Sequence, residues 1–125
     1  MKQFFLLLAF VFTAGALHAQ GAKAPLQDVS GITASIVSKL TTNLGLTDTQ
    51  KPRITTLVSN FLTQKAEIAP LQESNPNGYT KKLESMQHGL FNRFKTSLNA
   101  DQYTKFLALK PPTNDITNVL CKLFY

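Results

Sequence analysis

Apolar residues recur at steps of three and four along the chain after residue 28, which is the spacing of one face of an α-helix. The pattern predicts a first helix from Val29 to Leu44. Gly45 is expected to end it, because glycine readily adopts the left-handed conformation that often follows a helix. No run alternates between apolar and polar residues as a half-buried strand does. We therefore expect an all-α fold.

A second helix is expected to open at the pentapeptide LTDTQ, residues 46–50. The Thr47 side chain can accept a hydrogen bond from the main chain of Gln50, and the Gln50 side chain can reach back to Thr47, as in a capping box. Leu46 precedes the cap and is placed to act as a hydrophobic staple. The pentapeptide is thus complete as a signal for the start of a helix.

Two segments divide the chain beyond that helix. Pro70 cannot donate to the Ala66 carbonyl, so we expect a kink or an end between Ala66 and Glu73. The segment Ser74–Gly78, SNPNG, has the composition of a turn. A third helix with a broad apolar stripe is expected to follow it, up to Leu98.

The pentapeptide LNADQ, residues 98–102, nearly repeats the first one. Leu98 is again the staple, Asn99 the cap and Gln102 the reciprocal partner, which predicts the start of a fourth helix. Two such boxes can also arise by chance, because they are common at helix starts.

The segment Pro111–Pro112 is expected to end the fourth helix. Thr113 or Asn114 can then cap a short final helix. One side of that helix would carry five apolar residues, namely Ile116, Val119, Leu120, Leu123 and Phe124. The prediction is thus a small bundle or cradle of four to five amphipathic helices.

The N-terminal residues have the layout of a secretory signal peptide. Lys2 precedes the apolar run Phe4–Phe12, and small residues follow up to Ala19. The run is well short of the roughly 20 residues that span a bilayer, so we expect no membrane span. We predict cleavage after Ala19, a flexible leader at residues 20–28 and one helical domain at residues 29–125.

The formal charge of +6 at pH 7 falls to +5 when Lys2 leaves with the signal peptide. A basic protein outside the cytoplasm is not expected to meet nucleic acid. Anionic lipid head groups or misfolded chains are more suitable partners. The charge can equally serve solubility alone.

Residues for metal or nucleophile chemistry are scarce. After cleavage the chain keeps one histidine, His88, one cysteine, Cys121, and one methionine, Met86. These cannot form a transition-metal site in one chain, and no motif surrounds a nucleophile. We expect no enzyme, metal or cofactor. For Cys121 we favour a small, half-buried hydrophobe over a disulfide between subunits.

The doubled pentapeptide resembles the LTxxQ signature of the Spy/CpxP-like periplasmic proteins. The resemblance covers residues 33–109, and it departs from the signature at Asn99, where the family has Thr. Asn is an equally good cap. The family does not account for Pro70 or for the segment after Pro111.

This resemblance implies a periplasmic, cradle-shaped and usually dimeric helical protein. Such proteins bind unfolded or damaged envelope proteins without ATP, or restrain an envelope stress sensor. The alternatives that remain open are a regulatory protein that binds one folded envelope partner and a structural envelope protein. An open apolar concave face would favour the chaperone hypothesis, and a closed bundle would favour the alternatives.

Candidate residues for binding a client or partner follow from the resemblance and the apolar stripes. Lys65 falls in the middle of the stripe of the second helix, where it can either extend along the edge of the core or line an open groove. Whether the final helix fills that groove is not decided by the pattern. The candidates are Arg53, Phe61, Lys65, Ile68, Phe91 and Phe94.

Overall fold

The computed structural model describes residues 28–125, and the expected signal peptide and nearly all of the leader lie outside the described residues. Within residues 28–125 the fold is all-α, as predicted, and contains no strand. Four helices have nine or more residues and two have four residues. They are α2 (Val29–Leu44), α3 (Gln50–Ile68), α4 (Leu71–Ser74), α5 (Pro76–Ser97), α6 (Ala100–Ala108) and α7 (Cys121–Phe124).

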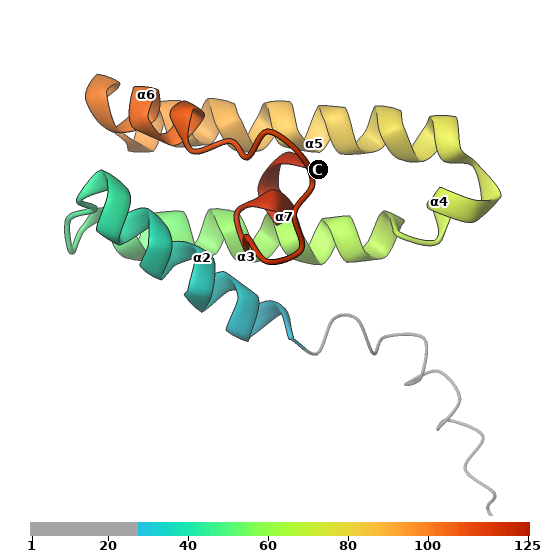
Figure 1. Cartoon of the computed structure of the whole chain (residues 1–125), viewed down its shortest axis with the longest axis horizontal. Coiled ribbons are helices and arrows are strands. Elements are labelled where there is room, and N and C mark those ends of the chain that lie inside the picture. The colour runs from blue at the N-terminus through green and yellow to red at the C-terminus, as the bar shows by residue number, and fades with distance from the viewer. Residues whose placement is uncertain (1–27) are drawn as a thin grey trace, which may run out of the picture.

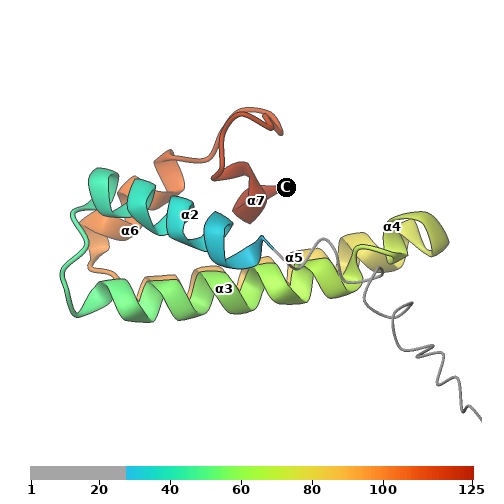
Figure 2. The same ribbon diagram turned by 90° about the horizontal axis from the view of Figure 1, so that it is seen from below.

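The helices form two layers. The long helices α3 and α5 run antiparallel and pack against each other as a hairpin (Figure 1). Helices α2, α6 and α7 lie on one side of this hairpin as a second layer (Figure 2). That layer covers the half of the hairpin where α3 begins and α5 ends. The other half, which ends in α4, extends beyond it.

Helix α2 has the predicted bounds. Ile36, Leu40 and Leu44 are buried on its inner face, at the spacing of one helical stripe. Gly45 adopts the left-handed conformation with φ 66° and donates its N–H to the Thr41 carbonyl. The chain therefore leaves the helix at the residue that the sequence indicates.

Helix α3 follows the predicted pattern at both ends. It buries Ile54, Val58, Phe61 and Leu62 against the rest of the fold. It ends at Ile68, inside the window expected from Pro70, and the single turn α4 continues the path of the chain.

The turn expected at Ser74–Gly78 is partly wrong: the break between α4 and α5 is confined to Asn75, because Pro76 already begins α5. The Asn75 side chain caps this helix by accepting a hydrogen bond from the Gly78 N–H at 3.1 Å. Pro76 occupies the first helical position, where its missing N–H costs nothing. The same residues that suggest a loop by composition therefore start a helix.

The expected final helix from Thr113 or Asn114 is also wrong. Only Cys121–Phe124 is helical, and Ile116 is 96% exposed. The Thr117 N–H and hydroxyl both donate to the Asp115 carboxylate, at 2.9 and 2.7 Å. Such side-chain bonds to the local backbone offer the chain an alternative to helix, which explains the turns here.

The core lies between the two layers and is centred on aromatic rings. Phe94 of α5 and Phe106 of α6 are fully buried, with ring centroids 4.9 Å apart. Phe124 of α7 stacks on Phe106 at 5.3 Å, and Leu120 and Leu123 are buried beside it. The C-terminal segment therefore fills the space between α3, α5 and α6. The sequence pattern did not decide whether it would do so.

Candidate functional site

Both predicted capping boxes form. The Gln50 N–H donates to the Thr47 hydroxyl oxygen at 3.2 Å, and the Thr47 N–H donates to the Gln50 side-chain oxygen at 3.0 Å. In the second box, the Gln102 N–H donates to the Asn99 side chain at 2.7 Å, and the Asn99 N–H donates back at 3.0 Å. Each box satisfies main-chain donors that have no partner inside the helix.

The side chains of Gln50 and Gln102 also hydrogen-bond to each other. The Gln50 Nε2 donates to the Gln102 Oε1 at 2.8 Å, and the Gln102 Nε2 donates to the Gln50 Oε1 at 3.0 Å. The Gln50 Nε2 also donates to the Ser97 carbonyl at 3.2 Å. This pair was not predicted, although the two glutamines hold the same position in the two repeated pentapeptides.

The amide pair lies inside the fold. Gln102 is 7% exposed, Gln50 is half-buried, and the staple residues Leu46 and Leu98 are buried. The pair joins the start of α3 to the start of α6. The six residues of the two boxes are therefore a structural element, as the sequence indicated.

Lys65 lies at a second convergence of elements. Its Nζ donates to the main-chain oxygens of Lys122 and Tyr125, at 2.9 and 2.6 Å. Both acceptors belong to α7 and the residue after it. Lys65 was expected either to extend along the edge of the core or to line an open groove. In the structure it is half-buried, its amine binds the C-terminal segment, and it also lines a groove beside that segment.

The pKa of Lys65 is lowered from its ordinary value of 10.5 to about 8, and burial is the largest cause. The positive charge of Lys122 also contributes to this lowering, and Cys121 acts in the opposite direction. Tyr79 and Tyr125 line the space around the same amine. A neutral amine still carries two N–H donors, so deprotonation leaves a donor for each main-chain oxygen.

We expect this lowered pKa to make the free energy of unfolding depend on pH. Between about pH 8 and 10.5 the unfolded chain holds a proton on Lys65 that the folded chain has lost, so stability rises with pH across this window. A Lys65→Met variant lacks that rise. Chemical denaturation of both proteins at pH 7.5 and 10.5 measures it. A ¹³Cε shift of Lys65 that titrates with the other lysines would contradict it.

A cleft of about 210 Å³ opens beside this amine, and we call it the Lys65 groove. It lies between α2, the end of α3, the start of α5 and α7. Its lining is mostly apolar and includes two lysines, Lys65 and Lys122. The lining residues are Val29, Ile32, Leu62, Lys65, Ala66, Ala69, Gln72, Tyr79 and Lys122.

A second donor serves the same segment from α5. The Gln87 Nε2 donates to the Leu123 carbonyl at 3.2 Å. Lys65 of α3 and Gln87 of α5 therefore bind main-chain oxygens of the C-terminal segment, those of Lys122, Leu123 and Tyr125. Sequence reasoning missed Gln87, because nothing in the local pattern marks a polar residue of α5 as a partner for a segment 36 positions away.

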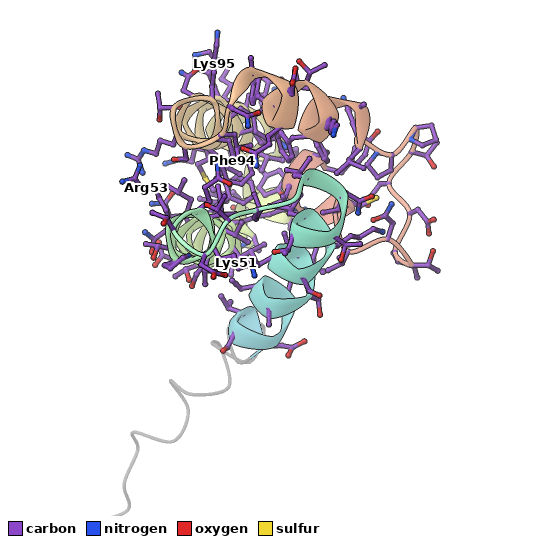
Figure 3. All side chains as sticks on the ribbon, turned by 90° about the vertical axis from the view of Figure 1, so that its left-hand side faces the viewer. Lys51, Arg53, Phe94 and Lys95 are labelled. Atoms are coloured by element: carbon purple, nitrogen blue, oxygen red, sulfur yellow. The ribbon has the colours of Figure 1, made fainter. Side chains whose placement is uncertain are left out.

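The remaining candidates fall in different places. Phe61 and Phe94 are buried in the core and so cannot form a client surface in this conformation, which corrects their candidate role. Phe91 is half-buried, with its ring 5.5 Å from that of Phe124. Ile68 is half-buried, and Arg53 is exposed. Figure 3 shows Phe94 between the helices and Arg53 pointing outward.

The histidine and the cysteine that the sequence singled out for metal or nucleophile chemistry lie in different surroundings. His88 is exposed on α5, and Cys121 is buried. The Cys121 Sγ accepts a hydrogen bond from the Asp115 N–H at 3.1 Å, in keeping with a small buried side chain. In residues 28–125, no group of three or more His, Cys, Asp and Glu side chains is placed to hold a metal ion.

Searches against protein-family models, curated protein sequences and solved structures found no match to this chain. Among the described helices, none is both long enough and apolar enough to cross a membrane.

Proposed function

We propose that this chain is a non-catalytic binding protein of the cell envelope, which holds unfolded or damaged polypeptides without ATP. The observation that carries the proposal is the way in which the protein binds its own C-terminal segment. Lys65 and Gln87 donate to main-chain oxygens of that segment, while its apolar side chains enter the core. The periplasmic location and the resemblance to the LTxxQ proteins belong to the same proposal.

Recognition of main-chain oxygens suits a protein with many clients. Every polypeptide has carbonyl groups, so a donor that binds them does not select a particular side chain. Apolar contacts supply most of the affinity in such a site, because each hydrogen bond adds only about 0.5–1.5 kcal/mol net. The lysine charge adds a general attraction for acidic or carbonyl-rich segments.

The test is suppression of aggregation of a denatured reporter protein, followed by light scattering. We expect the wild-type protein to suppress scattering at a several-fold molar excess. Ala69→Trp places a large ring in the Lys65 groove and is expected to remove most of this effect. The control Ala34→Trp puts the same ring on an exposed position of α2, and suppression is expected to persist. If the wild-type protein does not suppress aggregation of the reporter, the proposal is wrong.

A second candidate is a regulatory protein that binds one folded envelope partner. The closed state of the bundle favours it, because Leu107 and Ile116 are the exposed large apolar side chains in residues 28–125. They lie on different elements and form no extended apolar patch. This candidate predicts a single dominant partner in a pull-down from envelope extract, together with no effect on reporter aggregation.

A further inference from the structure

The last seven residues, Val119–Tyr125, form a segment that we call the C-terminal strap. Its one helical turn is α7. Leu120 and Leu123 are fully buried, and Phe124 packs against the rings of Phe91 and Phe106 at 5.5 and 5.3 Å. The strap thus covers the apolar floor that α3, α5 and α6 build.

The hydrogen bonds that hold the strap use its main chain. The carbonyls of Lys122 and Leu123 lie in the last turn of α7, where a helix has no internal partner for them. Lys65 binds the Lys122 oxygen and Gln87 binds the Leu123 oxygen. Helices α3 and α5 therefore supply the donors that the end of this short helix lacks. A cation at this end is also favoured by the helix dipole.

The connection to the strap is weakly attached to the rest of the fold. Side chains from Pro112 to Thr117 are exposed. Lys39 Nζ of α2 donates to the Asn118 side chain at 3.1 Å. Other hydrogen bonds join the connection to the strap itself: the Cys121 Sγ accepts from the Asp115 N–H at 3.1 Å, and the Tyr125 hydroxyl donates to the Pro111 carbonyl at 2.6 Å. Helices α2, α3, α5 and α6 meanwhile contact one another directly. The strap can therefore leave without separating the longer helices.

Open space also exists next to the strap. A second cleft of about 250 Å³ adjoins the Lys65 groove, and its lining includes Asn114, Asp115 and Ile116. Lys65, Gln72, Tyr79 and Lys122 line both clefts. An incoming polypeptide can therefore reach the Lys65 amine before the strap has moved.

We propose that the C-terminal strap is an intramolecular competitor for the binding site, and that a client displaces it. The client class is an apolar segment that forms a short helical turn whose last carbonyls have no partner within the turn, as in the strap. This inference rests on the proposed function. A client can bind only those molecules in which the strap has left the site. The apparent affinity for a client is therefore the intrinsic affinity multiplied by the fraction of such molecules.

The test uses full-length variants and a labelled peptide with the sequence of residues 117–125 in which Cys121→Ser prevents disulfide formation. Phe124→Ala removes the main anchor of the strap and leaves the groove intact. We expect this variant to bind the peptide about tenfold or more tightly than the wild-type protein, measured by fluorescence anisotropy. The control Leu44→Ala removes a similarly buried side chain, at 5% exposure, from the C-terminal end of α2, which lies apart from α7 (Figure 1). It is expected to bind the peptide as the wild-type protein does.

Hydrogen exchange in the wild-type protein gives an independent measurement that needs no variant. The amides of Leu123 and Tyr125 donate to main-chain oxygens within the strap. We expect them to exchange faster than the amides of α3 and α5, and to exchange faster still when the peptide is bound. Exchange of the strap and of both long helices at one common rate would overturn the inference, because the strap would then open only with the whole fold.

The outcomes separate the two proposals. Equal peptide affinity of the wild-type protein and Phe124→Ala would overturn strap competition and leave the proposed function standing. Tighter peptide binding by Phe124→Ala, with no suppression of reporter aggregation by either protein, would support strap competition and overturn the chaperone proposal.

Discussion

Replacing Phe106 with alanine is expected to lower the free energy of unfolding by about 3–5 kcal/mol, the usual cost of removing a fully buried Phe side chain. Phe106 is 0% exposed, and four other aromatic rings surround it. Each such pair adds about 0.5–1.5 kcal/mol beyond burial of area. Since a domain of this size is stable by only about 5–15 kcal/mol, the variant would lose a large part of its stability.

Urea denaturation followed by circular dichroism measures this loss. Leu107→Ala is the matched control, because Leu107 follows Phe106 on α6 and is 46% exposed. It is expected to change the free energy of unfolding by less than about 1 kcal/mol. A loss below about 2 kcal/mol for Phe106→Ala would contradict the central place of this ring in the core.

The second large effect is expected at the amide pair. Gln102→Leu keeps the volume of the side chain but removes its hydrogen bonds to Asn99, Gln50 and the carbonyls of Leu44 and Gly45. We expect a loss of about 2–4 kcal/mol, because a cap is lost and buried polar groups are left without partners. Urea denaturation measures the loss, and Gln64→Leu on an exposed face of α3 is the control.

A double-mutant cycle with Gln50→Leu tests whether the two glutamines act as a pair. We expect a coupling energy of about 0.5–3 kcal/mol, since groups in one hydrogen-bonded network are not additive. Gln102→Glu sharpens the test, because a carboxylate still accepts from Gln50 Nε2 and cannot donate to Gln50 Oε1. Additive losses would show that each glutamine only caps its own helix.

Much of the fold follows from local signals. The stripe from Val29 to Leu44, the left-handed stop at Gly45 and the break before Pro70 depend on spacing and on backbone chemistry within a few residues. Both capping boxes are of the same kind, since each partner lies three positions from the other. Such features are therefore predicted with their bounds nearly right.

The errors have equally local causes. Asn75 and Pro76 favour a turn by composition, and the same two residues are also a good cap and a good first residue for a helix. Apolar spacing alone predicts a longer final helix. In the structure the Asp115 side chain accepts hydrogen bonds from Thr117, and the chain turns there. As a result Ile116, expected on an apolar helix face, lies in solvent.

The features that define the candidate site are long-range. Lys65 and its two main-chain acceptors are 57 and 60 positions apart, and Gln87 and its acceptor are 36 apart. No local pattern encodes which carbonyl a polar side chain will reach. The sequence marked Lys65 as an unusual residue in an apolar stripe, and only the packing of the strap shows what its amine binds.

The amide pair also has a consequence for the order of folding. Gln50 and Gln102 are 52 positions apart, and closing a flexible loop of that length costs on the order of 3–4 kcal/mol. Two neutral hydrogen bonds return about 1–3 kcal/mol, so they cannot close the loop alone. When α3 and α5 are paired, however, Gln50 already lies beside Ser97, and only a few residues remain to be ordered. The two glutamines therefore meet after the hairpin has formed, and a slip of one turn between α3 and α5 would keep them apart.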